Sequence, residues 1–263
     1  MKIYQCNPIP GDPVFILNYF NSKLNYMKSV YFIILSIYVV LLPSCEKIEG
    51  YGPILSEVRN HKNFGGLRVS ICGQVNYQIA PDYQVEVLAQ ANILDELVTK
   101  VEDDDLVLKW DHPLRIKNCE DITVNIKGPY LNKIVSSGSS DIKVTGEVRE
   151  ADLDLDISGS GSIAIQEALI TDQLTAHLSG SGEMYIGSGK ADITRLYVSG
   201  SGEIDFGKIE SLENQSHISG SGSIVVHVQE FLEAHISGSG DVYYSGNPRV
   251  NAKISGSGRV KKR

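Results

Sequence analysis

Three histidines occupy the same place in a recurring sequence context. His177, His217 and His235 each stand two residues before a Ser-Gly-Ser-Gly tetrapeptide. Neutral imidazole is a common zinc ligand. If the tetrapeptides mark stacked coils, His217 and His235 lie about 5 Å apart, close enough to share a metal ion. The same place in other copies holds Asp156, Tyr197 and Lys253. Because this column offers no obvious third ligand, we favour surface histidines and keep His217 and His235 as metal candidates.

An acidic group is the second set of residues that could do chemistry. Asp152, Asp154 and Asp156 alternate with leucine along one predicted strand face, and Arg149 is nearby. Parallel β-helix lyases use acidic clusters to bind calcium and a basic residue to abstract a proton. The alternative, which we favour, is a solvated strand face that discourages aggregation. An EF-hand is excluded because Ile157 stands where that loop requires glycine.

The remaining motifs give no catalytic assignment. Gly187-Ser188-Gly189-Lys190 resembles part of a phosphate-binding loop, but Ala191 follows where serine or threonine must bind magnesium. Serines are abundant, yet they belong to a repeated row and none is singled out as a nucleophile. We therefore predict a protein that is not an enzyme and has no cofactor, and a lyase-like activity is the alternative.

The tetrapeptide itself recurs at a fixed period through the second half of the chain. A degenerate copy begins at Ser137, and the steps between first serines are 21, 21, 20, 20, 18 and 18 residues. The full copies begin at Ser158, Ser179, Ser199, Ser219, Ser237 and Ser255. Such a period is typical of a solenoid. The alternative is a flexible Ser/Gly-rich linker.

The flanking residues decide between these alternatives. Aliphatic residues alternate on both sides of the glycines, as in Leu153, Leu155, Ile157 and then Ile163 and Ile165. Strict alternation predicts a strand with one buried face, which carries the aliphatic residues and the glycines. The serines then point outward and form a surface ladder. Its members are Ser158, Ser160, Ser179, Ser181, Ser199, Ser201, Ser219, Ser221, Ser237 and Ser239. We predict a β-solenoid over residues 131–263.

The first 54 residues have the pattern of an export signal followed by a tether. Lys28 precedes the apolar run Val30 to Leu42, and Leu42-Pro43-Ser44-Cys45 resembles a lipobox. We predict a lipoprotein signal peptide at residues 27–44, lipidation of Cys45 and a tether at 45–54. Residues 1–26 do not suit an export signal, so we expect translation to begin at Met27. An uncleaved anchor or a simple signal peptide is the alternative.

Charge and cysteine content restrict the partners. The chain has a formal net charge of −8, and its leader carries three lysines and one aspartate, so the chain from Cys45 onward is about −10. An acidic surface argues against nucleic acid and leaves acyl chains as the attachment to the membrane. Cys72 and Cys119 remain, and an oxidising compartment permits a disulfide between them, although the sequence does not place them in contact.

Residues 55–130 lack the tetrapeptide but are again β-like. The predicted strands are centred on 67–71, 75–79, 85–89, 97–101, 106–110 and 122–126. Asp103, Asp104 and Asp105 form an acidic turn between two of these strands, and 92–96 could form one helical turn. No long helical period occurs, so the protein is all-β. This segment is either a small β domain or the cap that a solenoid needs over its first coil.

Several stretches together resemble the putative auto-transporter adhesin, head GIN domain family. They are Phe64-Gly-Gly-Leu-Arg-Val-Ser, Ala91-Asn-Ile-Leu-Asp-Glu-Leu, Leu106-Val-Leu, Pro129-Tyr-Leu and the serial Ser-Gly-Ser-Gly coils. The resemblance covers residues 60 to 263. It implies a lipid-anchored or secreted envelope protein of Gram-negative bacteria with a right-handed β-helical fold. No translocating barrel is part of this sequence, so the auto-transporter half of the name does not carry over.

Three functions remain open from the sequence. The first is a non-enzymatic module of the outer membrane or cell surface that presents a rigid face to a protein or glycan. The second is a structural or sensory envelope lipoprotein, on the periplasmic face or self-associating through an open solenoid end. The third is a polysaccharide-active enzyme on the same scaffold. We favour the first, because the outward serine rows and the aromatic residues between them suit polar recognition.

Overall fold

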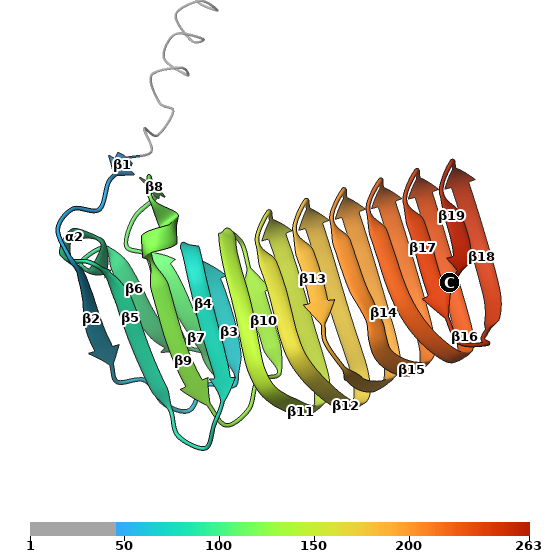
Figure 1. Cartoon of the computed structure of the whole chain (residues 1–263), viewed down its shortest axis with the longest axis horizontal. Helices are drawn as coiled ribbons and strands as arrows, with labels where there is room; N and C mark the ends of the chain where they lie inside the picture. Colours follow the sequence, from blue (N-terminus) through green and yellow to red (C-terminus); the bar gives the residue numbers. More distant parts are fainter. Residues whose placement is uncertain (1–45) are drawn as a thin grey trace, which may run out of the picture. The chain divides into compact units, whose positions relative to one another are not determined.

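The structure, a computed structural model, describes residues 46–263 (Figure 1). The predicted upstream extension at 1–26, the signal peptide at 27–44 and the lipidation site Cys45 lie outside the described residues. Among residues 46–263, no helix is long and apolar enough to cross a membrane.

The repeats form a stack of parallel, in-register strands, which confirms the predicted β-solenoid. Each long strand bends, so β11 pairs with β12 over three segments separated by register shifts after Val144 and Glu150. The strands of the stack are β10 (Lys133–Ser136), β11 (Ser139–Gly159), β12 (Ser162–Gly180), β13 (Glu183–Ile186), β14 (Gly189–Gly200), β15 (Glu203–Gly220), β16 (Ser223–Gly238), β17 (Asp241–Ser245), β18 (Arg249–Gly256) and β19 (Arg259–Lys262). Figure 1 shows them side by side, ending at β18 and β19.

The core of the solenoid consists of aliphatic ladders, as the alternation predicted. Ile157, Leu178 and Val198 occupy one register position on consecutive coils and are buried. Residues of one column lie about 4.8 Å apart, so each side chain packs on the equivalent side chain above and below it. The aliphatic side chains are buried in this way by equivalent residues of the neighbouring coils. No side chain needs a specific partner of a different type.

The glycines meet one of the two requirements that we expected from the sequence. We expected both to face the interior, either to let the backbone bend tightly or because the opposite wall leaves no room for a side chain. Instead, Gly180 has a positive φ of 130° and is half-exposed, while Gly182 is buried. A Cβ on Gly180 would lie 2.3 Å from the carbonyl oxygen of Gly159 in the preceding coil. The constraint therefore comes from the neighbouring coil along the axis, not from the opposite wall.

Three core positions are polar where the alternation predicts aliphatic residues. Thr194 and Asn214 share one column, Ser216 stands in the next column on the same strand as Asn214, and all three are buried. The Asn214 amide donates to Thr194 Oγ1 at 2.8 Å, and Ser216 Oγ donates to Asn214 Oδ1 at 2.6 Å. Because the three side chains satisfy one another, the core tolerates them.

The N-terminal segment forms the six predicted strands and one that was not predicted, β2 (Ile54–Arg59). The predicted ones are β3 (Gly66–Ser70), β4 (Cys72–Ile79), β5 (Gln84–Gln90), β6 (Leu97–Glu102), β7 (Asp105–Trp110) and β9 (Thr123–Gly128). The one-turn helix α2 (Ala91–Leu94) lies near the expected position, and η1 (Cys119–Asp121) is a short 3-10 turn. β6 and β7 form the predicted hairpin, and Asp103 and Asp104 take positive φ at its turn. Within the expected tether, β1 (Glu46–Ile48) pairs with β8 (Leu114–Ile116).

The coils of this segment stack out of chain order. β3 pairs in parallel with β10 on one side and with β7 on the other. In the same way β4 lies between β11 and β9. The coil made by residues 66–79 is therefore inserted between the coil of residues 105–128 and the first repeat. The parallel stack thus continues without a break across residue 131. Antiparallel strands cover its N-terminal end: β5 and then β2 pair beyond β9, and β6 pairs beyond β7.

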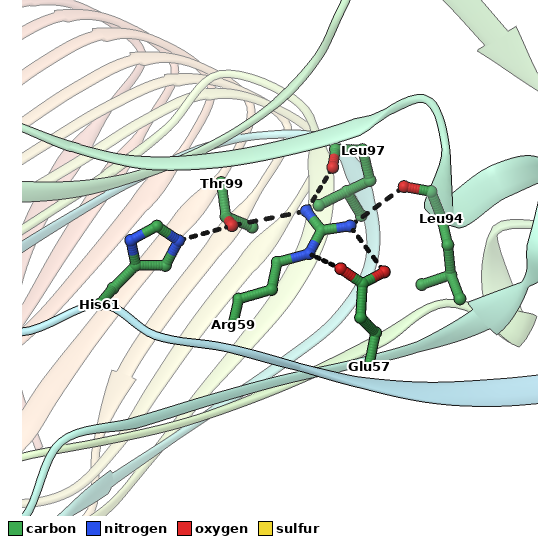
Figure 2. Close-up of polar contacts among 6 residues, drawn as sticks. All are labelled: Glu57, Arg59, His61, Leu94, Leu97 and Thr99. Atoms are coloured by element: carbon green, nitrogen blue, oxygen red, sulfur yellow. Dashed lines mark hydrogen bonds and ion pairs between the residues drawn. The ribbon is translucent and has the colours of Figure 1, made fainter.

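Two features fasten this end of the stack. A disulfide joins Cys72 in β4 to Cys119, with Cα atoms 5.4 Å apart, and links the two coils that are stacked out of order. The second feature is Arg59 in the edge strand β2. Its guanidinium donates to the carbonyl oxygens of Leu94 and Leu97 and pairs with Glu57 at 3.1 Å (Figure 2). Arg59 therefore ties the edge strand β2 to the segment that leads from α2 into β6.

Candidate ligand-binding groove

The most organised surface feature is a column of stacked rings, which we call the ring ladder. It consists of His177, Tyr197, His217 and His235 on four consecutive coils. The ring centroids are 4.5, 5.1 and 4.9 Å apart, and successive ring planes differ by 5°, 11° and 24°. The separation of His217 and His235 agrees with the 5 Å that the repeat register predicted.

The ladder is a direct result of the parallel register. His177, Tyr197 and His217 occupy one position on the coils, and the next residue in each strand is buried in the core. Each ring therefore stays opposite the rings of the neighbouring strands. The strands cannot shift in register, because a slip of one residue would expose the aliphatic ladder to water. The column extends at its ends to Asp156, which pairs with His177, and to Lys253, which pairs with His235.

The ring ladder forms one side of a groove of about 620 Å³. The first-serine column lies along it, contributing Ser179, Ser199, Ser219, Ser237 and Ser255, and Asp156 and Lys253 stand at its ends. This volume falls within the range of small-molecule sites. The groove runs along the stack and crosses six coils, so it suits an elongated ligand.

Stacking determines which parts of the rings a ligand can touch. The faces of Tyr197 and His217 are covered by their neighbours in the ladder. Their edges remain, carrying the imidazole nitrogens and the tyrosine hydroxyl. A ligand in the groove therefore encounters hydrogen-bonding groups at a regular interval, with serine hydroxyls beside them.

The electrostatics of the groove centre on His217 and His235. Burial lowers the pKa of His217, and the nearby His235 lowers it further, while Glu233 opposes the change. His235 Nε2 lies 3.2 Å from Glu233 Oε1. Glu233 lies two residues before His235 on the same strand, in the neighbouring column. The residues of the histidine column alone therefore did not predict it. Strand alternation could have found it, because residues two apart share a face.

The structure places the other predicted site residues as follows. The first serines of consecutive copies are in register, so this half of the predicted serine ladder is continuous, whereas the second serines (Ser160, Ser181, Ser201, Ser221 and Ser239) fall between the paired strands. His217 and His235 come together, but residues 46–263 contain no group of three His, Cys, Asp or Glu side chains arranged to hold a metal ion. Asp152 and Asp154 are opposite Gln173 and Thr175, so the acidic set does not continue onto the next coil. Arg149 pairs instead with Glu147.

Fold and surface together define the class: a β-solenoid in which an ordered side-chain column borders a groove. The family model described as "Putative auto-transporter adhesin, head GIN domain" matches residues 63–248. The chain belongs to this family. No curated protein matches the chain.

Solved structures with the same fold include proteins from Bacteroides and Parabacteroides species. A putative adhesin from Bacteroides fragilis NCTC 9343 is 22% identical with a TM-score of 0.74, covering 82% of this chain and 100% of that one. A structure titled putative lipid binding protein, from Parabacteroides distasonis ATCC 8503, is 21% identical with a TM-score of 0.67, covering 83% and 100%. A putative adhesin from Parabacteroides merdae ATCC 43184 is 16% identical with a TM-score of 0.62, covering 83% and 100%. At these identities the similarity shows the fold alone.

Proposed function

We propose that this protein is a non-enzymatic binding protein of the outer membrane or cell surface. It is held there by lipid at Cys45, and the groove beside the ring ladder is its recognition surface. The observation that carries the proposal is the ladder itself. Four rings aligned in register along a 620 Å³ groove form an extended, rigid and repeating contact surface. Rigid aromatic side chains lose little conformational entropy on binding, which suits recognition.

The arrangement of polar groups supports binding over catalysis. Among the described residues, no groove serine hydrogen-bonds to a groove histidine, whereas a nucleophile and its base need such contact. Asp156 and Lys253 stand at opposite ends of the groove, separated by four rungs. Glu233 is engaged with His235. The groove therefore offers spaced contacts along its length, and among the described residues its one carboxylate–imidazole pair, Glu233–His235, has no groove serine hydrogen-bonded to it as a nucleophile.

A binding screen of full-length protein against glycan and protein arrays tests the proposal. The variant His177→Ala/Tyr197→Ala/His217→Ala removes three rungs, and we expect it to weaken binding of any captured ligand roughly tenfold or more. The matched control is Tyr185→Ala, since Tyr185 is 38% exposed and does not line the groove. Equal binding by the two variants would place the recognition surface elsewhere.

The envelope location is a separate part of the proposal. The lipobox-like sequence before Cys45 supports it, and the family match agrees with an envelope or surface location. Incorporation of a labelled fatty acid that disappears in Cys45→Ser tests the anchor. Digestion of the protein by protease added to intact cells distinguishes the outer surface from the periplasmic face.

We also propose that the protein self-associates through an open strand edge at an end of the stack. Within the described residues, β2 pairs only with β5, and β18 pairs only with β16. An open strand edge can pair with another chain. Val250 and Ile254 on β18 are 37% and 42% exposed, so apolar surface accompanies the open edge. Light scattering on the full-length protein over a concentration series tests this, and a constant monomer mass would exclude it.

A further inference from the structure

We infer that the ligand of the groove is an extended acidic polysaccharide, and that the protein binds it more tightly as the pH falls from neutral to about 5.5. This inference rests on the proposed function, in which the groove is the binding surface. It adds the chemical class of the ligand and a dependence on proton uptake.

The spacing of the ladder favours a sugar polymer over a peptide. The rungs repeat every 4.5 to 5.1 Å along the groove. An extended peptide presents side chains on one face every ~6.7 Å, so it would lose register with the rungs within two or three contacts. A hexopyranose unit in an extended chain is about as long as one coil is thick. One sugar unit can therefore meet one rung, and the same contact can recur along the groove.

The chemistry of the rungs favours a ligand rich in hydroxyl groups. The interior ring faces are covered by stacking, so a flat apolar ligand finds no free face between the ends of the ladder. What remains is a row of imidazole edges and one tyrosine hydroxyl, with a row of exposed serines alongside. Both rows carry donors and acceptors at the coil spacing, which matches a chain of hydroxyl-bearing units.

The charges at the groove favour an acidic chain. On the coils next to His217 lie Tyr197 and Arg195 on β14, and His235 and Glu233 on β16. On the far side of His235 lies Lys253 on β18. Glu233 is the carboxylate that acts on His217 and contacts His235, and Asp156 lies at the other end of the groove. Protonation of the three ladder histidines would give this part of an acidic protein a local positive charge.

Binding and proton uptake are linked through these histidines. A ligand carboxylate beside an imidazole stabilises the imidazolium form, so the complex binds protons that the free protein does not. Sugar carboxylates stay ionised at pH 5.5, because their pKa values are near those of other carboxylic acids, about 4. The affinity for an acidic chain must therefore rise as pH falls, whereas the affinity for a neutral chain has no such term.

Calorimetric titration of full-length protein with polygalacturonate and dextran, at pH 7.5 and 5.5 and constant ionic strength, tests the inference. We expect polygalacturonate to bind roughly tenfold more tightly at pH 5.5 and dextran to show no such change. In His217→Gln/His235→Gln the ratio of the two affinities should fall to about one, since glutamine cannot be protonated. In Lys253→Gln binding should weaken at both pH values.

His227→Gln is the matched control for the histidine variants. His227 is half-buried and contacts Ser245 Oγ, but it does not line the groove, so this variant should keep the wild-type ratio. Binding of dextran, or of laurate titrated in parallel as a fatty-acid probe, in preference to polygalacturonate, abolished by the triple ladder variant, would overturn the acidic-glycan inference and leave the proposed function intact. Failure of every probe and array ligand to respond to the ladder variants would overturn both. An affinity ratio that persists in the double glutamine variant would refute the histidine linkage.

Discussion

The repeat coils and the N-terminal coils build the same parallel stack by different means. From β10 onward each strand pairs with the equivalent residues of the next copy. One short sequence repeat supplies the core residues, the bends and the surface columns. In residues 46–128 the strands β3 and β7 also stack in parallel, but antiparallel β2, β5 and β6 surround them. A disulfide and a partly buried arginine hold this end together.

The difference shows what repetition provides in a solenoid. In the repeats, stability comes from many equivalent contacts between neighbouring coils, and no single side chain fixes the order. At the N-terminal end each coil has a different sequence, so unique contacts must specify which coil lies beside which. The groove lies on the repeat side, where equal spacing generates a continuous column.

The largest effect is expected from a glycine within the repeats. Gly200→Ala adds a Cβ 2.3 Å from the carbonyl oxygen of Gly180, at a residue with φ of 132°. Backbone strain and displacement of the neighbouring coil together should lower the free energy of unfolding by about 4 kcal/mol. Guanidinium denaturation followed by circular dichroism measures this change.

The control for Gly200→Ala is Gly52→Ala, outside the repeats. Gly52 also has positive φ, at 84°, but nothing lies within 4 Å of its added Cβ. This variant should lose about 1 kcal/mol, from backbone strain alone. Equal losses in the two variants would mean that close packing between coils is not what requires glycine in the repeats.

The next effect is expected at the N-terminal coils. Cys72→Ser/Cys119→Ser opens a link that spans 47 residues of sequence, and the free energy of unfolding should fall by about 3 kcal/mol. Limited proteolysis should then cut first within residues 105–128, while the repeats stay protected. Wild-type protein in reducing agent should behave in the same way. Early cleavage in the repeats would show that the two regions do not unfold separately.

A smaller effect is expected from the arginine that holds β2. Arg59→Met leaves the carbonyl oxygens of Leu94 and Leu97 without their donor, and we expect a loss of about 2 kcal/mol in thermal or chemical unfolding. The control is Arg149→Met in the repeats, where the arginine side chain is 67% exposed and should contribute less than about 0.5 kcal/mol. A comparable loss from Arg149 would assign individual side chains a role in ordering the repeats.

The smallest effect is a dependence of stability on pH. The pKa of His217 is lowered in the folded protein by burial and by His235, and that of His61 by burial and by Arg59. As pH falls below about 6.5 the unfolded chain binds protons first, so stability decreases. Because the rings are partly exposed, we expect each to contribute only a few tenths of a kcal/mol.

Melting temperatures of the ligand-free protein at pH 7.5 and 5.5 measure the pH dependence. His217→Gln should remove part of the decrease, and the part that remains belongs to His61 in the N-terminal segment. A free protein that becomes more stable on acidification would contradict the lowered pKa values. Acidification is expected to lower the stability of the free protein but to raise its affinity for an acidic polysaccharide. The two experiments therefore distinguish an effect on stability from an effect on ligand affinity.

The repeats could be predicted because local pattern and global position coincide there. The alternation around Ile157 and Leu178 assigned the core, and the constant period assigned the register. The ring ladder followed in outline from that register, through His217 and His235. Its function as one side of a groove did not, because a groove depends on how two surface columns curve relative to each other. Asn214 was also missed, since a polar residue is acceptable in a core only when its partners are known.

The sequence alone determined that the chain builds a stack of β coils. When apolar residues alternate and the pattern repeats every 18–21 residues, stacking the coils in register buries all of them together. Tertiary structure decided the order of the coils of residues 66–79 and 105–128. Their sequences carry no shared phrase, so pairing depends on long-range contacts such as the Cys72–Cys119 disulfide. It also decided that four rings on separate coils form one column, because a surface exists only once distant segments are held side by side.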